Sequence, residues 1–145
     1  MKIAIGSDHG GFELKEKIKS YLKKKKIKVD DFGTDSLGSC DYPDLAYPVA
    51  AAVAKKKYDR GILICGSGVG VTIVANRVRG IRAVNAYNVD IAKQSRLHGD
   101  CNILCLGGRY IKNDKALKIV DAWIKTPFSN EEGHLRRIRK IERKR

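Results

Sequence analysis

The sequence of 145 residues contains no apolar run long enough to cross a bilayer. Its longest nearly uncharged apolar run, 45–54, is interrupted by Pro48 and falls well short of the roughly 18 residues that a membrane span needs. The first residues, MKIAIGSDHGG, hold too few apolar side chains before Gly6 for the apolar segment of about 7 to 15 residues in a secretory signal. We therefore expect a cytosolic protein with no membrane partner.

Cysteine is scarce as well, with four residues at positions 40, 65, 101 and 105. In a chain without an export signal these are expected to remain thiols rather than to form a disulfide framework. The spacing of His98, Cys101 and Cys105 has some likeness to a zinc site, but the two cysteines bracket an expected strand and only one histidine is near. We expect no metal, and we interpret Cys101 and Cys105 as small buried hydrophobes.

Acidic residues number 16 against 30 lysines and arginines, which gives a net charge of +14. This excess favours anionic partners, which include nucleic acids, acidic membrane surfaces and phosphorylated metabolites. Two clusters carry much of it, one over 23–28 and one from Arg136 to Arg145. The first is typical of a solvated helix end, where lysine offsets the negative pole of the helix dipole. Aromatic residues are few and are not interleaved with a basic face, which disfavours nucleic-acid binding.

Short β-rich segments alternate with loops and helical patterns along the whole chain. Strands are predicted over 2–6, 28–32, 61–65, 81–86 and 102–106. Near-continuous apolar strands suit a parallel sheet covered on both faces. We predict a single α/β domain over 1–145, a three-layer α/β/α sandwich with a Rossmann-like five-stranded parallel sheet. A C-terminal helix over 131–145 is expected to extend from it and to dock on a partner subunit.

Three glycine-rich loops follow the first, third and fifth strands, at 6–11, 65–70 and 107–109. In open parallel sheets ligands bind beyond the carboxyl ends of the strands, although glycines can also serve only tight turns. The loop 66–70 opens a helix, so its N–H groups can face an anion. Its third glycine arrives one residue too early for a dinucleotide loop, and no Lys-Ser or Lys-Thr follows, as a nucleotide triphosphate loop requires.

Several side chains could carry chemistry at these places. Cys65 ends a strand beside a helix N-terminus, which favours a thiolate that acts as base or nucleophile, although a buried strand cysteine is the simpler interpretation. His98 follows a helical stretch, beside the edges of the strands, with Gly99 at a position typical of a left-handed helix cap, and a helix-terminal histidine is more often a dipole partner. His134 and Arg137 share one helix face, as anion ligands or as a solvated charge face.

These motifs occur together in a known family. The chain resembles the type B ribose-5-phosphate isomerases, which belong with the galactose-6-phosphate and allose-6-phosphate isomerases in the ribose/galactose isomerase family. The resemblance extends over essentially the whole chain in motif order and length. Its most specific part is the segment Ile-Cys-Gly-Ser-Gly-Val-Gly at 64–70. The other matching segments are Gly-Ser-Asp-His-Gly-Gly at 6–11, Asp-Tyr-Pro at 41–43, Gly-Ile-Arg-Ala at 80–83, Ser-Arg-Leu-His at 95–98 and His-Leu-Arg-Arg-Ile at 134–138.

The resemblance implies a role for each matched residue. Cys65 is the expected base, and His98 is the expected proton donor that opens the furanose ring. The expected anion hole consists of the Ser67 hydroxyl and the N–H groups of Gly66, Ser67, Gly68, Val69 and Gly70. Asp8, Tyr42 and Gly99 match positions near the sugar. The expected phosphate ligands are His9, Arg109, His134 and Arg137, of which the last two come from the partner chain.

The activity implied by the resemblance is the interconversion of D-ribose 5-phosphate and D-ribulose 5-phosphate through an enediolate, a step of the non-oxidative pentose phosphate pathway. The family also implies a homodimer, in some members a dimer of dimers, with active sites shared at the subunit boundary and no metal or organic cofactor. An isomerase of allose 6-phosphate or galactose 6-phosphate is one alternative. A basic nucleic-acid-binding domain is an alternative of another class.

The chain departs from the family pattern at three positions. Gly133 stands where the family usually has arginine, and Arg136 is rotated from the face of Arg137 by about 100° on a helix. Gly99 stands where the family usually has asparagine, so the turn can survive while a side-chain amide is lost. Ser67 replaces a frequent threonine and keeps the hydroxyl. We expect weaker phosphate binding and the loss of one hydrogen bond to the substrate.

Overall fold

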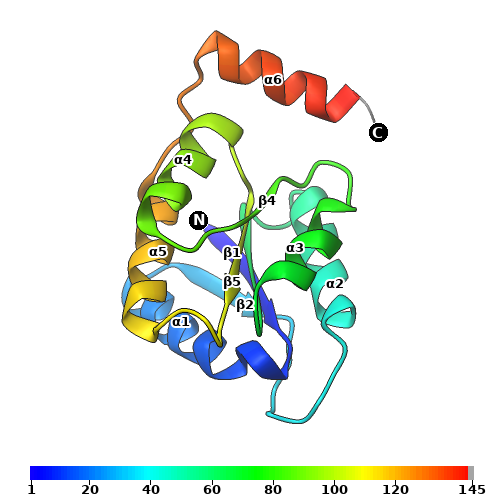
Figure 1. Cartoon of the computed structure of the whole chain (residues 1–145), viewed down its shortest axis with the longest axis vertical. Coiled ribbons are helices and arrows are strands. Elements are labelled where there is room, and N and C mark those ends of the chain that lie inside the picture. Colours follow the sequence, from blue (N-terminus) through cyan, green and yellow to red (C-terminus); the bar gives the residue numbers. More distant parts are fainter. Residues whose placement is uncertain (144–145) are drawn as a thin grey trace.

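A parallel sheet of five strands forms the middle layer of the computed structural model, which describes residues 1–143 (Figure 1). The strand order is β2-β1-β3-β5-β4, and every neighbouring pair is parallel. The strands are β1 (Lys2–Ser7), β2 (Lys28–Asp31), β3 (Arg60–Cys65), β4 (Ala83–Asn85) and β5 (Ile103–Gly107). The predicted five-stranded parallel sheet is confirmed.

Helices cover both faces of the sheet (Figure 1). One core layer joins the sheet to α1 (Phe12–Lys24), α4 (Val89–Gly99) and α5 (Asn113–Lys125). The other joins it to α2 (Tyr42–Ala54) and α3 (Val69–Asn76). A short 3-10 helix, η1 (His9–Gly11), precedes α1. The three-layer sandwich is therefore confirmed, and no helix within residues 1–143 is long and apolar enough to cross a membrane.

The apolar strands explain why the sheet lies between two helical layers. Along β3, Ile62 and Ile64 face the layer of α1, α4 and α5, whereas Leu63 and Cys65 face α2 and α3. Since successive side chains of a strand point to opposite faces, a run that is apolar throughout is stable only where both faces are buried. The predicted strand over 81–86 is shorter, because Ile81 N donates to Val78 O and closes a turn before β4.

The strand order reverses between β1 and β3. From β1 the chain passes through α1 to the edge strand β2, and from β3 it passes through α3 on the opposite face. The loops that follow β1 and β3 therefore diverge to opposite sides of the sheet. A crevice at such a point, beyond the carboxyl ends of the strands, is where open α/β sheets bind ligands.

The last helix, α6 (Glu132–Arg143), lies beyond the amino edge of the sheet next to α4 (Figure 1). None of its residues is buried in the chain, and its apolar stripe is only half covered at Leu135 and Ile138 and is exposed at Ile141. The predicted C-terminal helix is therefore present, and Lys144 and Arg145 lie outside the described residues. A helix so little covered by its own chain has surface left for a partner.

A buried ammonium group ties α1 to the end of β2. The side chain of Lys15 is fully buried, and its Nζ pairs with Asp31, which also accepts from Lys19 Nζ at 2.7 Å and from Gly33 N at 2.8 Å. Burial alone would raise the pKa of Asp31, but these hydrogen bonds outweigh it, and the pKa lies below its ordinary value. Gly33 O in turn accepts from Ser7 N at 2.6 Å, so the pair also supports the end of β1.

Removing the carboxylate of this pair should destabilise the fold more than removing its ammonium. Asp31→Asn leaves the Lys15 charge buried and unpaired, so we expect it to lower the free energy of unfolding by about 3 kcal/mol at pH 7. Lys15→Met should cost much less, because Asp31 keeps Lys19 and Gly33. The loss of unfolding free energy in Asp31→Asn should be complete above the ordinary aspartate pKa of about 3.9. It should shrink as the pH falls through the lower pKa that Asp31 has in the folded protein.

Urea unfolding of both variants at pH 7 and below pH 4 measures these differences. Asp30→Asn is the matched control, because Asp30 is the preceding residue and pairs with Lys2 on the surface. Equal losses for Asp31→Asn and Asp30→Asn would contradict a stabilising role for the buried pair.

Candidate functional site

The three glycine-rich loops meet at the carboxyl edge of the sheet. Gly108 N donates to Cys65 O at 2.8 Å, and Arg109 N donates to Gly66 O at 3.0 Å. A Cβ atom on Gly10 would lie 3.0 Å from Gly66 N, and one on Gly108 would lie 2.8 Å from Gly10 O. The loops thus pack backbone against backbone, which only glycine allows at these distances. The prediction that they emerge together from one edge is confirmed.

Cys65 ends β3 with its sulfur against the start of α3. Its Sγ accepts a hydrogen bond from Gly68 N at 3.1 Å, and Gly68 is the residue that caps α3. A donor and a helix N-terminus at the sulfur both stabilise negative charge there. The side chain is only 5% exposed and belongs to the core layer of α2 and α3. Cys65 therefore has the burial of a core cysteine and also the hydrogen-bond donor that a reactive thiolate needs.

The turn after Cys65 depends on glycine at position 68. Gly68 has φ +80°, and a Cβ atom there would lie 2.6 Å from Asn85 Oδ1 and 2.9 Å from the carbonyl carbon of Leu106. Asn85 Nδ2 also donates to Ser67 O at 3.3 Å, so the end of β4 supports the same turn. This conformation directs Gly68 N at the sulfur of Cys65.

The loop that follows is exposed on one side and walled by an aromatic ring on the other. Ser67 is exposed, and its Oγ accepts from Val69 N at 3.2 Å. Tyr42, at the start of α2, packs its ring on Gly70, where a Cβ atom would lie 2.6 Å from Tyr42 Cζ. The loop 66–70 therefore presents a hydroxyl and backbone N–H groups beside the tyrosine ring, as an anion hole requires.

His9 and Arg109 line a hollow of about 240 Å³ next to this loop, together with Gly10, Glu13, Leu14, Leu37, Gly108 and Asn113. Cys40 N donates to His9 Nδ1 at 3.2 Å, so in the neutral ring the proton is on Nε2, which is then a donor. The side chain of Arg109 lies over Gly66, where a Cβ atom would be 3.2 Å from Arg109 Nη1. Two donors of this kind in one small hollow suit a phosphate group.

Asp8 joins this group from the end of β1. It is 7% exposed, and its Oδ1 accepts from Gly10 N at 2.9 Å, which caps η1. Its own N–H donates to Ile64 O at 3.2 Å and so holds the loop against β3. The carboxylate is therefore fixed at the same edge as Cys65.

His98 lies at the amino edge of the sheet, at the other end of the strands from Cys65. Because α4 starts after the carboxyl end of β4 and runs back towards the start of β5, its last residues lie at the amino edge (Figure 1). There the His98 ring stacks on His134 of α6, with ring centroids 4.1 Å apart and planes at 26°. His134 Nδ1 lies 2.7 Å from Ser129 Oγ, and Ser129 N donates to Leu97 O at 3.1 Å. The two histidines are thus held as one unit.

The end of α4 differs from the prediction at Gly99. This residue is helical, and Asp100 is the left-handed residue, with φ +44°. Asp100 tolerates this conformation because its carboxylate pairs with Arg96 at 2.8 Å and with Arg82 at 3.3 Å. The expectation of a left-handed Gly99 is wrong by one residue, and Gly99 belongs to the last turn of the helix beside His98.

The predicted site residues therefore form two groups. The carboxyl-edge group comprises Asp8, His9, Tyr42, Cys65, the loop 66–70 and Arg109. The amino-edge group comprises His98, Gly99, His134 and Arg137, whose Nη1 lies near Gly133. The length of the sheet separates the two groups within one chain (Figure 1).

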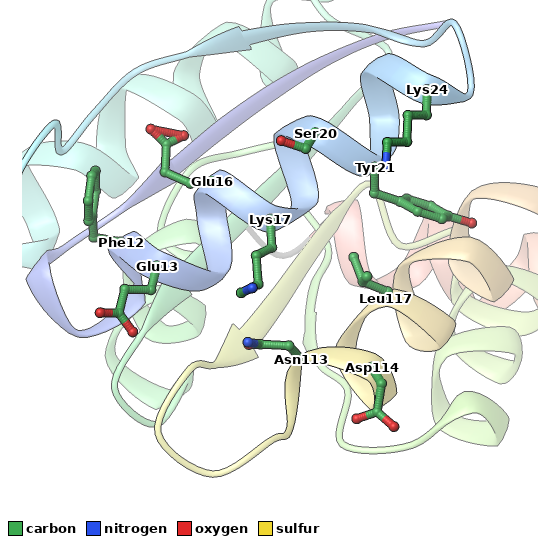
Figure 2. Close-up of a pocket in the computed structure, with 10 residues that line it drawn as sticks. All are labelled: Phe12, Glu13, Glu16, Lys17, Ser20, Tyr21, Lys24, Asn113, Asp114 and Leu117. Atoms are coloured by element: carbon green, nitrogen blue, oxygen red, sulfur yellow. The ribbon is translucent and has the colours of Figure 1, made fainter.

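The hollow of largest volume described in the structure lies elsewhere. It is a groove of about 760 Å³ between α1 and α5, lined by Glu13, Lys17, Tyr21, Asn113, Leu117 and five other residues (Figure 2). Its lining includes no residue of either predicted group. We therefore place the candidate site at the sheet edges and not in this groove.

Of the two cysteines interpreted as small buried hydrophobes, Cys105 is buried, whereas Cys101 is only half-buried. Cys105 is fully buried, and burial raises the pKa of its thiol to about 12. Burial also raises the pKa of Cys101, which is half-buried. Within residues 1–143 the structure contains no cluster of three or more histidine, cysteine or acidic side chains that could hold a metal.

Sequence reasoning missed two residues of the carboxyl edge. Asn85 supports the turn at Gly68, and its place at the end of an apolar strand is the signal that could have found it. Cys40 contributes through its backbone N–H to His9, and no side-chain pattern could indicate that contact.

Comparison with known proteins places this geometry in a family. A family model described as Ribose/Galactose Isomerase matches residues 3–141. The ribose-5-phosphate isomerase B of Escherichia coli is 44% identical over 140 residues, which cover 97% of this chain and 93% of that protein.

Solved structures agree with this match. The structure of ribose-5-phosphate isomerase B from Clostridium thermocellum is 50% identical with a TM-score of 0.97, covering 99% of this chain and 96% of that one. The enzyme from Mycoplasma genitalium with bound ribulose-5-phosphate is 42% identical with a TM-score of 0.95, covering 99% and 95%. The chain belongs to the ribose/galactose isomerase family.

Proposed function

We propose that the chain interconverts D-ribose 5-phosphate and D-ribulose 5-phosphate. The observation that carries this proposal is the sulfur of Cys65, held by Gly68 N beside a hollow that presents His9 and Arg109. Relatives named ribose-5-phosphate isomerase B, one of them with bound ribulose-5-phosphate, support the choice of substrate.

The chemistry requires a base near a C–H bond and donors near two oxygens. In the proposed reaction the Cys65 thiolate takes the proton from C2 of the open aldose, and negative charge passes to O1. The Ser67 hydroxyl and the N–H groups of the loop 66–70 other than Gly68 N, which donates to the Cys65 sulfur, stabilise this enediolate. The proton then returns to C1 while the hydroxyl proton of O2 passes to O1, which leaves the ketose.

A further proton transfer must precede this step, because the aldose is mainly a closed furanose. Opening the ring needs a proton on the ring oxygen and the loss of the proton on O1. We assign the first role to His98, whose ring is oriented by its stack on His134. Asp8 and Tyr42 are assigned to the sugar hydroxyls, and His9 and Arg109 to the phosphate.

The amino-edge group must then come from a second copy of the chain. One chain cannot bring His98 to Cys65, because the two residues lie at opposite ends of the parallel strands. Apolar side chains are exposed at both ends, with Val69 53% and Ile73 56% exposed on α3, Leu97 37% exposed on α4 and Ile141 52% exposed on α6. Burying these surfaces against each other would be favourable. We propose a homodimer with two shared sites, with a dimer of dimers as a further step of assembly.

The other candidate functions receive less support. An isomerase of allose 6-phosphate or galactose 6-phosphate would use the same machinery, and the pair His98 and His134 with Arg137 favours the pentose. A nucleic-acid-binding domain would not require a cysteine cradled by N–H groups, and the family to which the chain belongs consists of sugar phosphate isomerases. Gly99 and Gly133 remain departures expected to weaken substrate contacts.

The proposal includes a cytosolic location. All four cysteines are free in the structure, and Cys65 has to stay reduced in order to act as a base. A reducing compartment meets that need.

The purified protein should convert ribose 5-phosphate into ribulose 5-phosphate in a coupled assay. We expect kcat/KM for ribose 5-phosphate to exceed that for allose 6-phosphate and galactose 6-phosphate by at least about tenfold, because a longer chain must move either the phosphate or the reacting carbons from their places. A higher kcat/KM for a hexose phosphate would transfer the proposal to that substrate, and no turnover of any of the three would refute it.

Replacing Cys65 should remove the base without disturbing the phosphate subsite. Cys65→Ala should lower kcat by about a thousandfold, as expected for the loss of a general base, while the inhibition constant of inorganic phosphate stays unchanged. Cys105→Ala is the matched control, because it removes a second buried thiol from the same core layer. We expect this variant to lose stability but to retain the turnover of its folded fraction. A Cys65→Ala enzyme with near wild-type turnover would exclude this residue as the base.

Mixed dimers should test whether the sites are shared. When Cys65→Ala and Arg137→Ala chains are mixed and allowed to exchange, about half of the dimers are mixed, and each mixed dimer has one site with both groups intact. Activity should therefore return to about a quarter of the wild-type value per chain. If both residues act within one chain, verified mixed dimers should show no more activity than the parent variants.

A further inference from the structure

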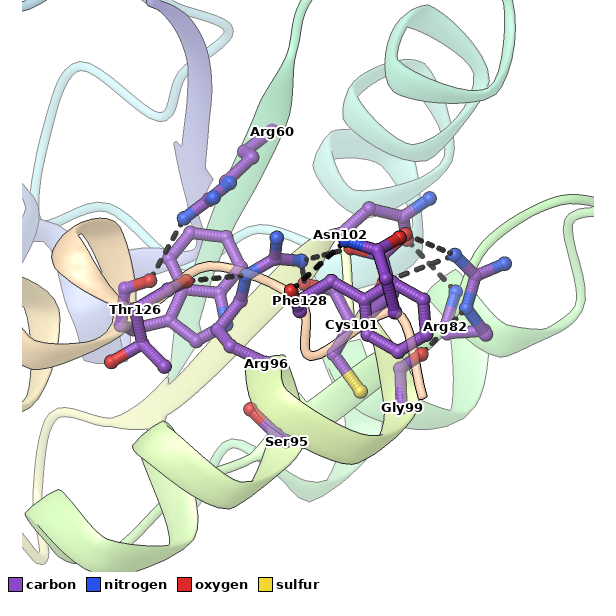
Figure 3. Close-up of polar contacts among 12 residues, drawn as sticks. Arg60, Arg82, Ser95, Arg96, Gly99, Cys101, Asn102, Thr126 and Phe128 are labelled. Carbon is purple, nitrogen blue, oxygen red and sulfur yellow. Dashed lines mark hydrogen bonds and ion pairs between the residues drawn. The ribbon is translucent and has the colours of Figure 1, made fainter. Parts of the chain in front are cut away.

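One arginine of the amino edge holds the end of α4. The side chain of Arg82 is 17% exposed, and its Nε donates to Gly99 O at 2.8 Å while Nη2 donates to Asp100 O at 3.0 Å (Figure 3). These carbonyl groups lie where a helix leaves its last acceptors without partners. Arg82 therefore caps the turn that carries His98.

The same guanidinium reaches α6. Arg82 Nη1 donates to Glu142 Oε1 at 2.7 Å, which forms an ion pair between the loop before β4 and the last turn of α6. Its backbone is fixed as well, because Arg82 N donates to Asn102 Oδ1 at 2.9 Å. Since a guanidinium is planar and rigid, it sets the direction of every partner that it binds.

Helix α6 is thus held at two points. The stack of His98 on His134 holds it near its beginning, and Glu142 holds it near its end, about 12 Å away along the helix at the usual rise per residue. Arg137 lies between these points, and none of the helix is buried in its own chain. Two fixed points define the direction of a helix, whereas one alone would allow it to pivot.

We propose that Arg82 and Glu142 are positioning residues that set the orientation of α6 and thereby the place of Arg137 at the phosphate. This inference rests on the proposed function, in which α6 serves the site of a second copy. Neither residue is assigned to the sugar phosphate, and both are proposed to act through the helix that carries Arg137. The expected consequence concerns phosphate binding more than the proton transfer at Cys65.

The direction in which KM changes when Glu142 is removed distinguishes a positioning role from a purely electrostatic one. Glu142 places a negative charge on a helix that is proposed to bind a phosphate. Its removal should lower KM if charge repulsion were its only influence. If it positions the helix, its removal should raise KM, because the lost orientation outweighs the reduced repulsion.

Glu142→Ala and Glu132→Ala form a matched pair for this test. Glu132 is on the same helix and pairs only on the surface, with Arg139 at 3.3 Å, so its loss removes the same charge without breaking the bridge. We expect Glu142→Ala to raise KM for ribose 5-phosphate about fivefold, as expected for losing a charge-assisted hydrogen bond that orders a binding helix, with kcat within about twofold. The inhibition constant of inorganic phosphate should rise by the same factor.

Two further variants support the comparison. Glu142→Gln keeps an acceptor for Arg82 Nη1 and should fall between wild type and Glu142→Ala. Arg82→Gln should affect both KM and kcat, since it also releases Gly99 and Asp100, and its thermal unfolding shows whether it folds. If Arg82→Gln does not fold, the comparison of Glu142→Ala with Glu132→Ala alone tests the positioning role.

Glu132→Ala should leave KM unchanged or slightly lower. Equal KM values in the two alanine variants, or a lower KM in Glu142→Ala, would overturn the positioning role. Size-exclusion chromatography at the assay concentration must show the same assembly for both. The turnover of the wild-type enzyme tests the proposed function separately. If the wild type is active and the two alanine variants have equal KM values, only the positioning role of Arg82 and Glu142 is refuted.

Discussion

The common direction of the five strands is the constraint on which the site depends. Because β1, β3 and β5 all end at one edge, three glycine-rich loops meet there and enclose Cys65, His9 and Arg109. For the same reason every helix that follows a strand ends at the other edge, and His98 at the end of α4 is carried away from Cys65. A parallel sheet thus separates the two groups of predicted site residues, which in the proposed homodimer are joined by two copies of the chain.

The same constraint arranges the charge. Helices α1, α2 and α3 all end at the amino edge, where their dipoles are negative. Basic residues end or follow each of them, at 23–26, at 55–57 and at positions 77 and 79, and α6 adds its own at the same end. Much of the positive excess therefore lies along the amino edge of the sheet, where His134 and Arg137 also lie. The charge of +14 therefore supports both helix stability and the attraction of a phosphorylated substrate.

Much of this architecture is predictable from the sequence, because apolar strands and glycine loops leave local signals. The strands, the layers and the convergence of the loops at 6–11, 65–70 and 107–109 follow from such patterns. The left-handed position was predicted one residue early, since the ion pairs that stabilise Asp100 come from Arg82 and Arg96 and are not visible in the local sequence. Long-range contacts such as the bridge from Arg82 to Glu142 have no local signal either, because sixty residues separate the partners.

We propose that one sugar phosphate is held by the carboxyl edge of one copy and the amino edge of another. A crystal structure of the protein with ribulose 5-phosphate bound would test it most directly. We expect the sugar to lie against Cys65 and Arg109 of one chain, with His98 and Arg137 of the partner completing the site. A sugar phosphate enclosed by a single chain, or bound in the groove between α1 and α5, would contradict this account.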